Sequence, residues 1–297
     1  PDLAGAIHKM LEENNDYKKK MEEVVRERTV LMKQDLLSKA KEIGGHRLIV
    51  IEQNVDPQML RDLSRRYGGV DVLALLTPGL VEELRARIPE ERCPRLAWVP
   101  NFLESLPENV DPEEREPVLL SVGRLDPIKG FDRLIRCFAQ VHALRPAWSL
   151  RLVGEGSERE KLEAQIRSAG LEGAVCLTGQ LDAVGVEAEM RRASVYAMSS
   201  HSEGFGIVLI EAQSCALPVV AFDVRVGPAA IVTDGVDGFL VPNGDEETYV
   251  QRMLALIDRE ELRREMARNA LEGARRFSRE QAARIWDDVL GEDADDA

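Results

Sequence analysis

One stretch decides the fold of this chain: Ser200-His201-Ser202-Glu203-Gly204-Phe205-Gly206-Ile207-Val208-Leu209-Ile210-Glu211-Ala212. It lies between two short apolar runs, Val195–Met198 and Leu217–Phe222, which are bounded by turn residues and rich in β-forming residues. Each run therefore predicts a buried parallel strand. Gly204 and Gly206 let the backbone turn tightly and approach a ligand without Cβ atoms in the way. The stretch predicts a glycine loop that joins a strand to a helix.

The helix of this stretch is expected at Ile207–Cys215, buried on most sides, and its free N-terminal N–H groups favour an anion in front of the glycines. Glu211 lies in an apolar run, where an unpaired carboxylate is costly to bury, so it needs a donor from the protein or from a ligand hydroxyl. Two interpretations stay open. In the structural one, Glu203 is a helix-terminal acid and Glu211 pairs with an arginine. In the functional one, this is a nucleotide-sugar site in which one carboxylate holds ribose hydroxyls, the helix N-terminus faces the diphosphate and the second acid lies near the sugar.

Composition restricts the class of protein. The chain has 297 residues, 44% of them hydrophobic, which is enough for one large or two ordinary domains with a substantial core. A net charge of −14 argues against broad, non-specific nucleic-acid binding, and an acidic tail that starts at Asp287 is expected to be solvated and frayed. The chain begins at Pro1 without a Met, as a piece of a longer protein would.

Cysteine usage and hydropathy bear on the compartment. The four cysteines lie among apolar neighbours without C-x-x-C spacing, which predicts buried free thiols in a reducing compartment: Cys93, Cys137, Cys176 and Cys215. The sequence shows no signal peptide and no run of eighteen apolar residues, so we expect a soluble cytoplasmic protein without a membrane span.

The N-terminal part is different in character from the rest. Leu3–Ile43 is dense in mixed charge and predicts a long helix, on which Met10, Tyr17, Val24 and Leu31 recur every seven residues. This seam predicts self-association. A strand at His46–Glu52 and a short helix at Pro57–Tyr67 are expected after it.

This N-terminal part has a resemblance of its own, which covers about the first 66 residues. Its segments Leu11-Glu12-Glu13-Asn14, Lys18-Lys19-Lys20-Met21-Glu22-Glu23 and Leu37-Ser38-Lys39-Ala40-Lys41-Glu42-Ile43 resemble the C-terminal region of bacterial alanyl-tRNA synthetases. The resemblance implies a dimerisation and tRNA-contact module, fused here to unrelated sequence. The competing interpretation is an arbitrary charged helix followed by a strand.

After Gly68-Gly69 strands and helices alternate, which predicts an α/β fold with a doubly wound parallel sheet, Rossmann-like, whose ligands bind at the carboxyl ends of the strands. Strands are expected at Val70–Leu76, Leu96–Val99, Val118–Val122, Ser149–Val153, Val175–Leu177, Val195–Met198, Val219–Phe222 and Gly238–Val241. Helices are expected at Pro78–Arg87, Phe131–Leu144, Glu158–Ala169, Glu187–Ala193, Ile207–Cys215 and, as one long stretch, Glu246–Arg276.

The loop after Val118–Val122 carries two cations, Arg124 and Lys129, within Ser121-Val122-Gly123-Arg124-Leu125-Asp126-Pro127-Ile128-Lys129-Gly130. An arginine offers a planar fork to phosphate oxygens and a lysine a point charge. The glycine spacing fits neither the P-loop nor the dinucleotide fingerprint. Alone, two loop cations are more often solvated than functional, but a glycine loop after a later strand of the same sheet favours an anion site. A lone loop histidine such as His201 is more often a polar contact, and no histidine has metal-ligand spacing, so no metal is predicted.

Val70–Leu290 as a whole resembles the retaining glycosyltransferases of family four, which have the two facing Rossmann-like domains of the GT-B architecture. The motifs that carry this resemblance are Ser121-Val122-Gly123-Arg124-Leu125, Lys129-Gly130-Phe131, Leu152-Val153-Gly154-Glu155-Gly156, the pair Glu203 and Glu211, and Asp234-Gly235-Val236-Asp237-Gly238-Phe239-Leu240-Val241.

The resemblance implies a role for each matching residue. It implies that Arg124 and Lys129 clamp the donor diphosphate, that Glu211 binds the ribose, and that Glu203 contacts the transferred sugar as the catalytic residue. The full donor-binding set that it implies is Gly123, Arg124, Lys129, Gly204, Phe205, Gly206, Ile207 and Glu211. No metal or cofactor is expected besides a UDP- or GDP-linked sugar donor, and the acceptor is unknown.

The expected organisation has three parts: 1–67, a long helix with a small α/β module; 68–115, a remnant of the N-terminal glycosyltransferase domain with a linker; and 116–297, the nucleotide-sugar-binding domain. The family's glycine-rich loop and histidine of the N-terminal domain have no counterpart here. We therefore expect a retaining hexosyltransferase whose nucleotide binding survives and whose turnover in this isolated chain is near background. The alternative is a non-catalytic assembly or tRNA-contacting module fused to a nucleotide-binding scaffold.

Overall fold

The computed structural model describes residues 49–52, 70–111 and 115–291. The helix and self-association seam predicted for Leu3–Ile43, the helix predicted for Pro57–Tyr67 and most of the region that resembles alanyl-tRNA synthetases lie outside these residues. The chain divides into two compact units, residues 1–100 with 280–297, and residues 101–279. The domain boundaries at residues 67 and 115 stay predictions, because residues 53–69 and 112–114, at or beside them, lie outside the described ranges.

The described part of the first unit is built on a parallel sheet in the order β1-β2-β3, with β1 at Ile49–Glu52, β2 at Val72–Leu75 and β3 at Arg95–Trp98. Helix α5 (Pro78–Arg87) connects β2 to β3, with a short 3₁₀ turn, η2, at Glu90–Arg92. Thr77 caps α5 by accepting from the amide of Leu80 at 3.3 Å.

The C-terminal helix α13 (Arg279–Gly291) belongs with this small sheet. Val289 packs in one apolar cluster with Val72, Ala74, Ala97 and Val99 of β2, β3 and the residue after β3. The expectation of a solvated tail from Asp287 onward is confirmed at its start, because Asp287 and Asp288 are exposed, but the expected fraying there was wrong, because both residues belong to α13. The apolar face of α13 packs on β2 and β3, and this packing holds Asp287 and Asp288 in the helix.

The second unit is a six-stranded, all-parallel sheet in the order β6-β5-β4-β7-β8-β9, which confirms the predicted α/β class. This is the doubly wound order of Rossmann folds. Its strands are β4 (Val118–Val122), β5 (Ser149–Val153), β6 (Val175–Gly179), β7 (Val195–Met198), β8 (Val219–Asp223) and β9 (Gly238–Pro242). Its helices are α6 (Phe131–Leu144), α7 (Arg159–Ser168), α8 (Ala183–Arg192), α9 (Ile207–Ser214), α10 (Pro228–Ile231), α11 (Glu246–Asp258) and α12 (Glu260–Ala274), with 3₁₀ turns η3 (Pro127–Lys129) and η4 (Arg275–Phe277).

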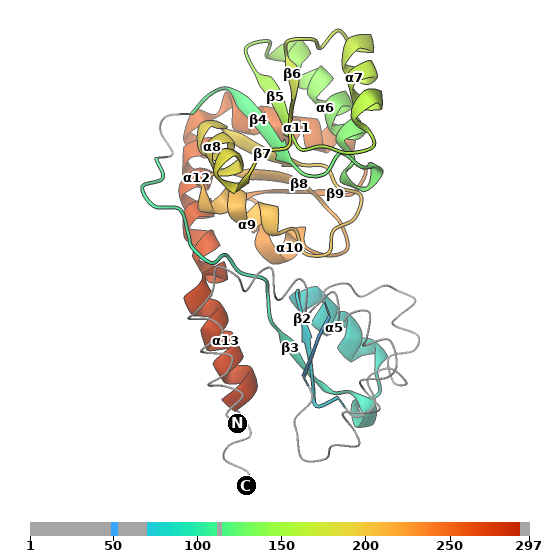
Figure 1. The fold of residues 1–297 in the computed structure, drawn as a ribbon, viewed down its shortest axis with the longest axis vertical. Helices are drawn as coiled ribbons and strands as arrows, with labels where there is room; N and C mark the ends of the chain where they lie inside the picture. The colour runs from blue at the N-terminus through green and yellow to red at the C-terminus, as the bar shows by residue number, and fades with distance from the viewer. Residues whose placement is uncertain (1–48, 53–69, 112–114, 292–297) are drawn as a thin grey trace. The chain divides into compact units, whose positions relative to one another are not determined.

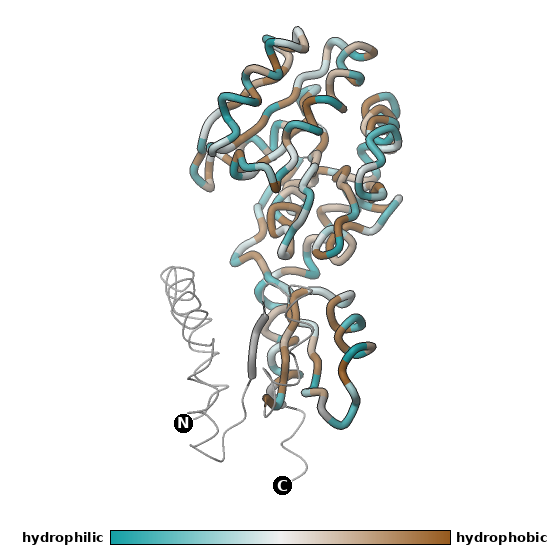
Figure 2. The backbone as a smooth tube through the Cα atoms, turned by 90° about the vertical axis from the view of Figure 1, so that its right-hand side faces the viewer, coloured by the Kyte–Doolittle hydropathy of each residue, from teal (hydrophilic) through white to brown (hydrophobic). Residues whose placement is uncertain are grey.

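Helices cover both faces of this sheet. Figure 1 shows α6, α7 and α11 on one face and α8, α9 and α12 on the other. Figure 2 shows hydrophobic and hydrophilic residues alternating along the outer helices, as expected of helices that turn one side to a sheet. The core between the layers includes Phe138, Phe222 and Tyr249, and the last two rings stack with centroids 4.2 Å apart.

The predicted long helix Glu246–Arg276 was wrong in one respect, because it is two helices that meet at Arg259. No glycine or proline marks this break in the sequence. The side chain of Arg263 donates to the carbonyls of Leu256 and Ile257 at 2.6 and 3.1 Å, and so caps the C-terminal end of α11 from the next helix.

The cysteines are free thiols, as expected, but not all of them are buried. Cys137 and Cys215 are buried, Cys93 is intermediate and Cys176 is exposed. Cys176 lies in β6, where alternate side chains point away from the core. In the part of the chain that the structure describes, no helix is both long and apolar enough to cross a membrane.

Candidate functional site

The sheet of the second unit changes its winding direction between β4 and β7, since β5 and β6 extend it one way and β8 and β9 the other. Ligands of doubly wound sheets bind in the crevice at such a switch point, outside the carboxyl ends of the strands. The β4–β7 register pairs Leu119 with Val195 and Leu120 with Tyr196. Beyond these pairs the Tyr196 hydroxyl donates to the carbonyl of Val122 and accepts from its amide, each at 3.2 Å.

The Tyr196 hydroxyl therefore fastens β7 to the last residue of β4 at the floor of the crevice, and we call this contact the Tyr196 pin. The residue is 1% exposed, and burial raises the pKa of its phenol well above the ordinary value, so the hydroxyl keeps its proton and both hydrogen bonds. Sequence reasoning placed Tyr196 in a strand but missed this function. An aromatic residue with a polar tip inside an otherwise aliphatic strand was the available signal.

A small hollow opens above this pin. It is lined by the end of β4, the 3₁₀ turn after it, the first residue of α6, and β7 with its following loop: Ser121, Val122, Lys129, Phe131, Tyr196, Met198, Ser199, Ser200 and Glu203. The predicted Lys129 and Glu203, 74 residues apart in sequence, therefore meet at one place. Arg124 and Glu211 are not among the residues that line it.

Lys129 and Glu203 form an ion pair, with Lys129 Nζ 2.7 Å from Glu203 Oε1. The hydroxyl of Ser200 donates to the same oxygen at 2.5 Å. The Glu203 side chain is only 7% exposed and the Lys129 side chain 25%. A partly buried carboxylate thus has two donors, and one of them is a cation that a stronger anion could attract away.

Arg124 lies in the same loop but is placed differently. Its side chain is 77% exposed, and its Nε donates to Asp126 Oδ2 at 2.5 Å. Both cations of the predicted phosphate clamp therefore have a carboxylate partner inside the protein. The loop that carries them is tied to β5 and to the turn after it, because Gly123 and Leu125 donate to the carbonyls of Val153 and Glu155.

The glycine loop adopts the expected conformation at one of its two glycines. Gly206 precedes α9 with a φ of +88°, which a side chain would resist. Phe205 is buried against the ring of Phe277, at 6.1 Å between centroids, so only its backbone is available to a ligand. A Cβ at Gly227 would lie 2.3 Å from the carbonyl oxygen of Phe205, so the chain before α10 packs directly on this loop.

Glu211 lies on α9 among fully buried neighbours but is itself half-buried. Its apolar sequence context suggested an enclosed carboxylate, but the Glu211 side chain is only partly covered. The N-terminal residues Ile207 and Val208 of the same helix are also half-buried, so this side of α9 is less covered than the side that carries Leu209 and Ile210.

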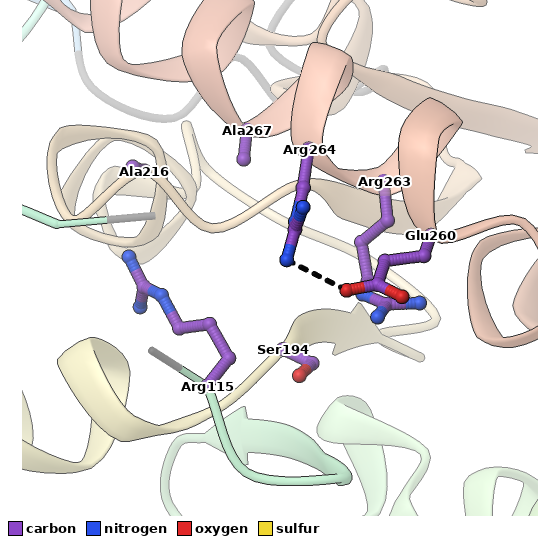
Figure 3. Close-up of a pocket in the computed structure, with 7 residues that line it drawn as sticks. All are labelled: Arg115, Ser194, Ala216, Glu260, Arg263, Arg264 and Ala267. Atoms are coloured by element: carbon purple, nitrogen blue, oxygen red, sulfur yellow. Dashed lines mark ion pairs between the residues drawn. The ribbon is translucent and has the colours of Figure 1, made fainter. Parts of the chain in front are cut away.

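A second hollow lies at the opposite, amino edge of the sheet and is lined by Arg115, Ser194, Ala216, Glu260, Arg263, Arg264 and Ala267 (Figure 3). Its arginines have structural partners. Arg115 donates to the carbonyls of Met190, Arg191 and Cys215, and Arg264 lies 2.8 Å from Glu260. Burial lowers the pKa of Arg115. Arg115 thus joins the linker to the C-terminal ends of α8 and α9, while the Arg264–Glu260 pair lies within α12. Within the described ranges, no group of three or more acidic, histidine or cysteine side chains is arranged to hold a metal ion.

The strand order defines a Rossmann-type unit with a hollow at its switch point. A family model described as glycosyl transferases group 1 matches residues 104–273, more than half of the chain. The chain belongs to this family.

An exopolysaccharide phosphotransferase of Streptomyces coelicolor is 32% identical over 265 residues, which cover 86% of this chain and 28% of that protein. The GtfA subunit of a UDP-N-acetylglucosamine–peptide N-acetylglucosaminyltransferase of Streptococcus gordonii is 30% identical and covers 70% of this chain and 42% of its own length. The chain thus spans less than half of either relative. Among solved structures, Anabaena HepE in complex with UDP matches with a TM-score of 0.73 at 22% identity, over 85% of this chain and 74% of that one, which shows a shared fold.

Proposed function

We propose that this chain binds a nucleoside-diphosphate sugar at the β4–β7 switch point and transfers the sugar with retention, as the resemblance to family four implies. The observation that carries the proposal is the Lys129–Glu203 ion pair in the hollow, reinforced by Ser200. The family membership supports it, and so do the relatives, one named for UDP-N-acetylglucosamine and one solved with UDP.

The diphosphate would bind between the cationic side chains of Lys129 and Arg124. Lys129 exchanges Glu203 for a phosphate oxygen, and the exposed Arg124 swings from Asp126 to a second oxygen, because its side chain is free to reorient. The N-terminal N–H groups of α9 lie behind Gly206 at the same carboxyl edge and add partial positive charge. These groups stabilise the negative charge that develops on the leaving diphosphate as the glycosidic bond breaks.

The two acids would then have separate tasks. Once Lys129 has moved to the phosphate, Glu203 becomes an acceptor for a hydroxyl of the sugar, held in position by Ser200. Glu211, half-buried on the less covered side of α9, accepts from the ribose hydroxyls. The backbone of Gly204–Ile207 lines the sugar side, since the Phe205 ring points into the core.

Calorimetric titration with UDP and then GDP tests the proposal. Lys129→Ala and Arg124→Ala should each weaken binding by about 1.5–3 kcal/mol, the scale of a hydrogen bond to a charged group. Lys161→Ala is the matched control, because Lys161 is an exposed lysine paired with Glu158 away from the hollow, and it should bind like the parent. If both site variants also bind like the parent, the clamp assignment is wrong.

Release of nucleoside diphosphate from a sugar donor tests the chemistry separately from binding. A glycosyltransferase that binds its donor releases the diphosphate when acceptor or water takes the sugar. UDP-glucose, UDP-N-acetylglucosamine and GDP-mannose would be compared at equal concentration. We expect only slow release from this isolated chain, a little above the Lys129→Ala background. Binding without any release above that background would contradict the transferase proposal and leave a nucleotide-binding module.

A further inference from the structure

A buried arginine lies beneath the Lys129–Glu203 pair. Arg133, the third residue of α6, is 3% exposed. Its Nε donates to the carbonyl of Ser199 at 2.6 Å, its Nη2 donates to the carbonyl of Ser200, and its Nη1 donates to Asn243 Oδ1 at 2.9 Å. The guanidinium lies over the ring of Phe222, 4.0 Å from the centroid. One side chain thus joins α6 to the loops after β7 and β9.

Stability alone does not account for a cation at this position. Its hydrogen-bond partners are two carbonyls and an amide rather than a carboxylate, and burial lowers the pKa of the guanidinium although the charges of Asp132 and Glu246 act in the opposite direction. A cation in the first turn of a helix also opposes the helix dipole. The three hydrogen bonds of the planar fork, by contrast, fix the position of backbone that carries site residues.

The backbone that Arg133 binds, at Ser199 and Ser200, contacts both Glu203 and the turn that carries Lys129. Ser200, whose carbonyl is bound by Arg133, gives its hydroxyl to Glu203 at 2.5 Å. The hydroxyl of Ser199 donates to the carbonyl of Lys129 at 3.0 Å, and the amide of His201 to the carbonyl of Ile128 at 2.7 Å. The loop after β7 is therefore seated on the turn that presents Lys129, with Arg133 below the junction.

We propose that Arg133 is a positioning residue, which holds the loop after β7 so that Glu203 and Lys129 face the same ligand atoms. This inference rests on the proposed function for its consequence in binding, but the local order that it requires can be measured without a ligand. Sites of this kind depend on supporting hydrogen bonds, because small displacements of the binding groups reduce affinity and rate.

Hydrogen exchange read by mass spectrometry on the whole chain tests the local order. Arg133→Met should speed exchange in peptides that cover residues 199–205, and Arg133→Lys less so, since an ammonium can reach one carbonyl but cannot span the fork. The matched control is Arg263→Met, another arginine that donates to two neighbouring carbonyls, those of Leu256 and Ile257. It should speed exchange near those residues and leave 199–205 unchanged. Parent-like exchange at 199–205 in Arg133→Met, or an equal increase over the whole chain, would overturn the inference.

Titration with UDP supplies the second readout. Arg133→Met should raise the Kd about tenfold or more, Arg133→Lys by less, and Arg263→Met by less than about twofold. If the parent binds neither UDP nor GDP, the proposed function fails, while the exchange data still decide whether Arg133 orders the loop. If the parent binds UDP and both Arg133 variants bind it equally well, the positioning inference fails alone. Should Arg133→Met not fold, Arg133→Lys carries both measurements.

Discussion

At the scale of the residue, the site in this structure is neutral by internal pairing. Lys129 is bound to Glu203 and Arg124 to Asp126, so an incoming diphosphate must compete with two protein carboxylates. The Arg124 side chain is 77% exposed but that of Asp126 only 15%, so moving Arg124 to a phosphate leaves a largely buried carboxylate without its cation. The Lys129–Glu203 pair is more enclosed. In the proposed function, the diphosphate takes Lys129 away from Glu203, so binding of the diphosphate and release of Glu203 occur together.

This coupling gives opposite expectations for binding and for chemistry in one variant. Glu203→Gln removes the competitor of the diphosphate, so affinity for UDP should stay equal or increase by up to about 1 kcal/mol. Release of UDP from a sugar donor should fall, since the carboxylate that contacts the sugar is lost. Calorimetry and donor hydrolysis measure the two effects. Glu163→Gln, which alters an ion pair on α7, should change neither. A weaker UDP affinity in Glu203→Gln would show that Glu203 assists diphosphate binding.

At the scale of the element, the sequence predicted what depends on local patterns. β4, β5, β7 and α6 begin and end at the predicted residues, because short apolar runs and turn residues define them. The break between α11 and α12 was missed, since the cap comes from Arg263 in the next helix. The fixing of Glu203 by Ser200, the Tyr196 pin and the Arg133 network were missed as well. Each depends on contacts between segments distant in sequence or on the rotamer of one side chain, which periodicity does not encode.

The junction between the turn of Lys129 and the loop after β7 is tight enough to test. Gly130 has a φ of +62°, and a Cβ there would lie 2.2 Å from the carbonyl oxygen of Ser199. Gly130→Ala should destabilise the protein by on the order of 3 kcal/mol and weaken UDP binding, because the two loops must separate.

Gly170→Ala separates this contact from backbone strain. Gly170 has nearly the same φ, +66°, but nothing lies within 4 Å of its Cβ position. Gly170→Ala should lower the free energy of unfolding by only about 1 kcal/mol, the strain of a left-handed alanine. Urea denaturation of both variants gives the difference. Equal losses would mean that the loops can adjust without cost.

At the scale of the whole molecule, the residues that line the switch-point hollow all lie in 101–279. The large apolar cluster around Phe138 and Tyr249 lies within the same unit. A piece comprising residues 101–279 should therefore fold with one cooperative transition and bind UDP with the affinity of the whole chain. Thermal unfolding and calorimetry decide this, with Lys129→Ala in the piece as the weakened-binding control. A folded piece with clearly weaker binding would mean that residues outside 101–279 contribute to the nucleotide site.

The internal pairing of Lys129 and Glu203 also affects how fast a ligand arrives. A nucleoside diphosphate is an anion, the chain carries a net charge of −14, and the site offers no unpaired cation on Lys129 or Arg124 to attract it from a distance. The long-range field during encounter is then repulsive. Since dissolved ions screen such fields over about 10 Å at 0.1 M, added salt should speed the association of UDP. Stopped-flow measurements at low and moderate ionic strength would show it, and an association rate that falls with salt would mean that a local positive field outweighs the charge of the whole molecule.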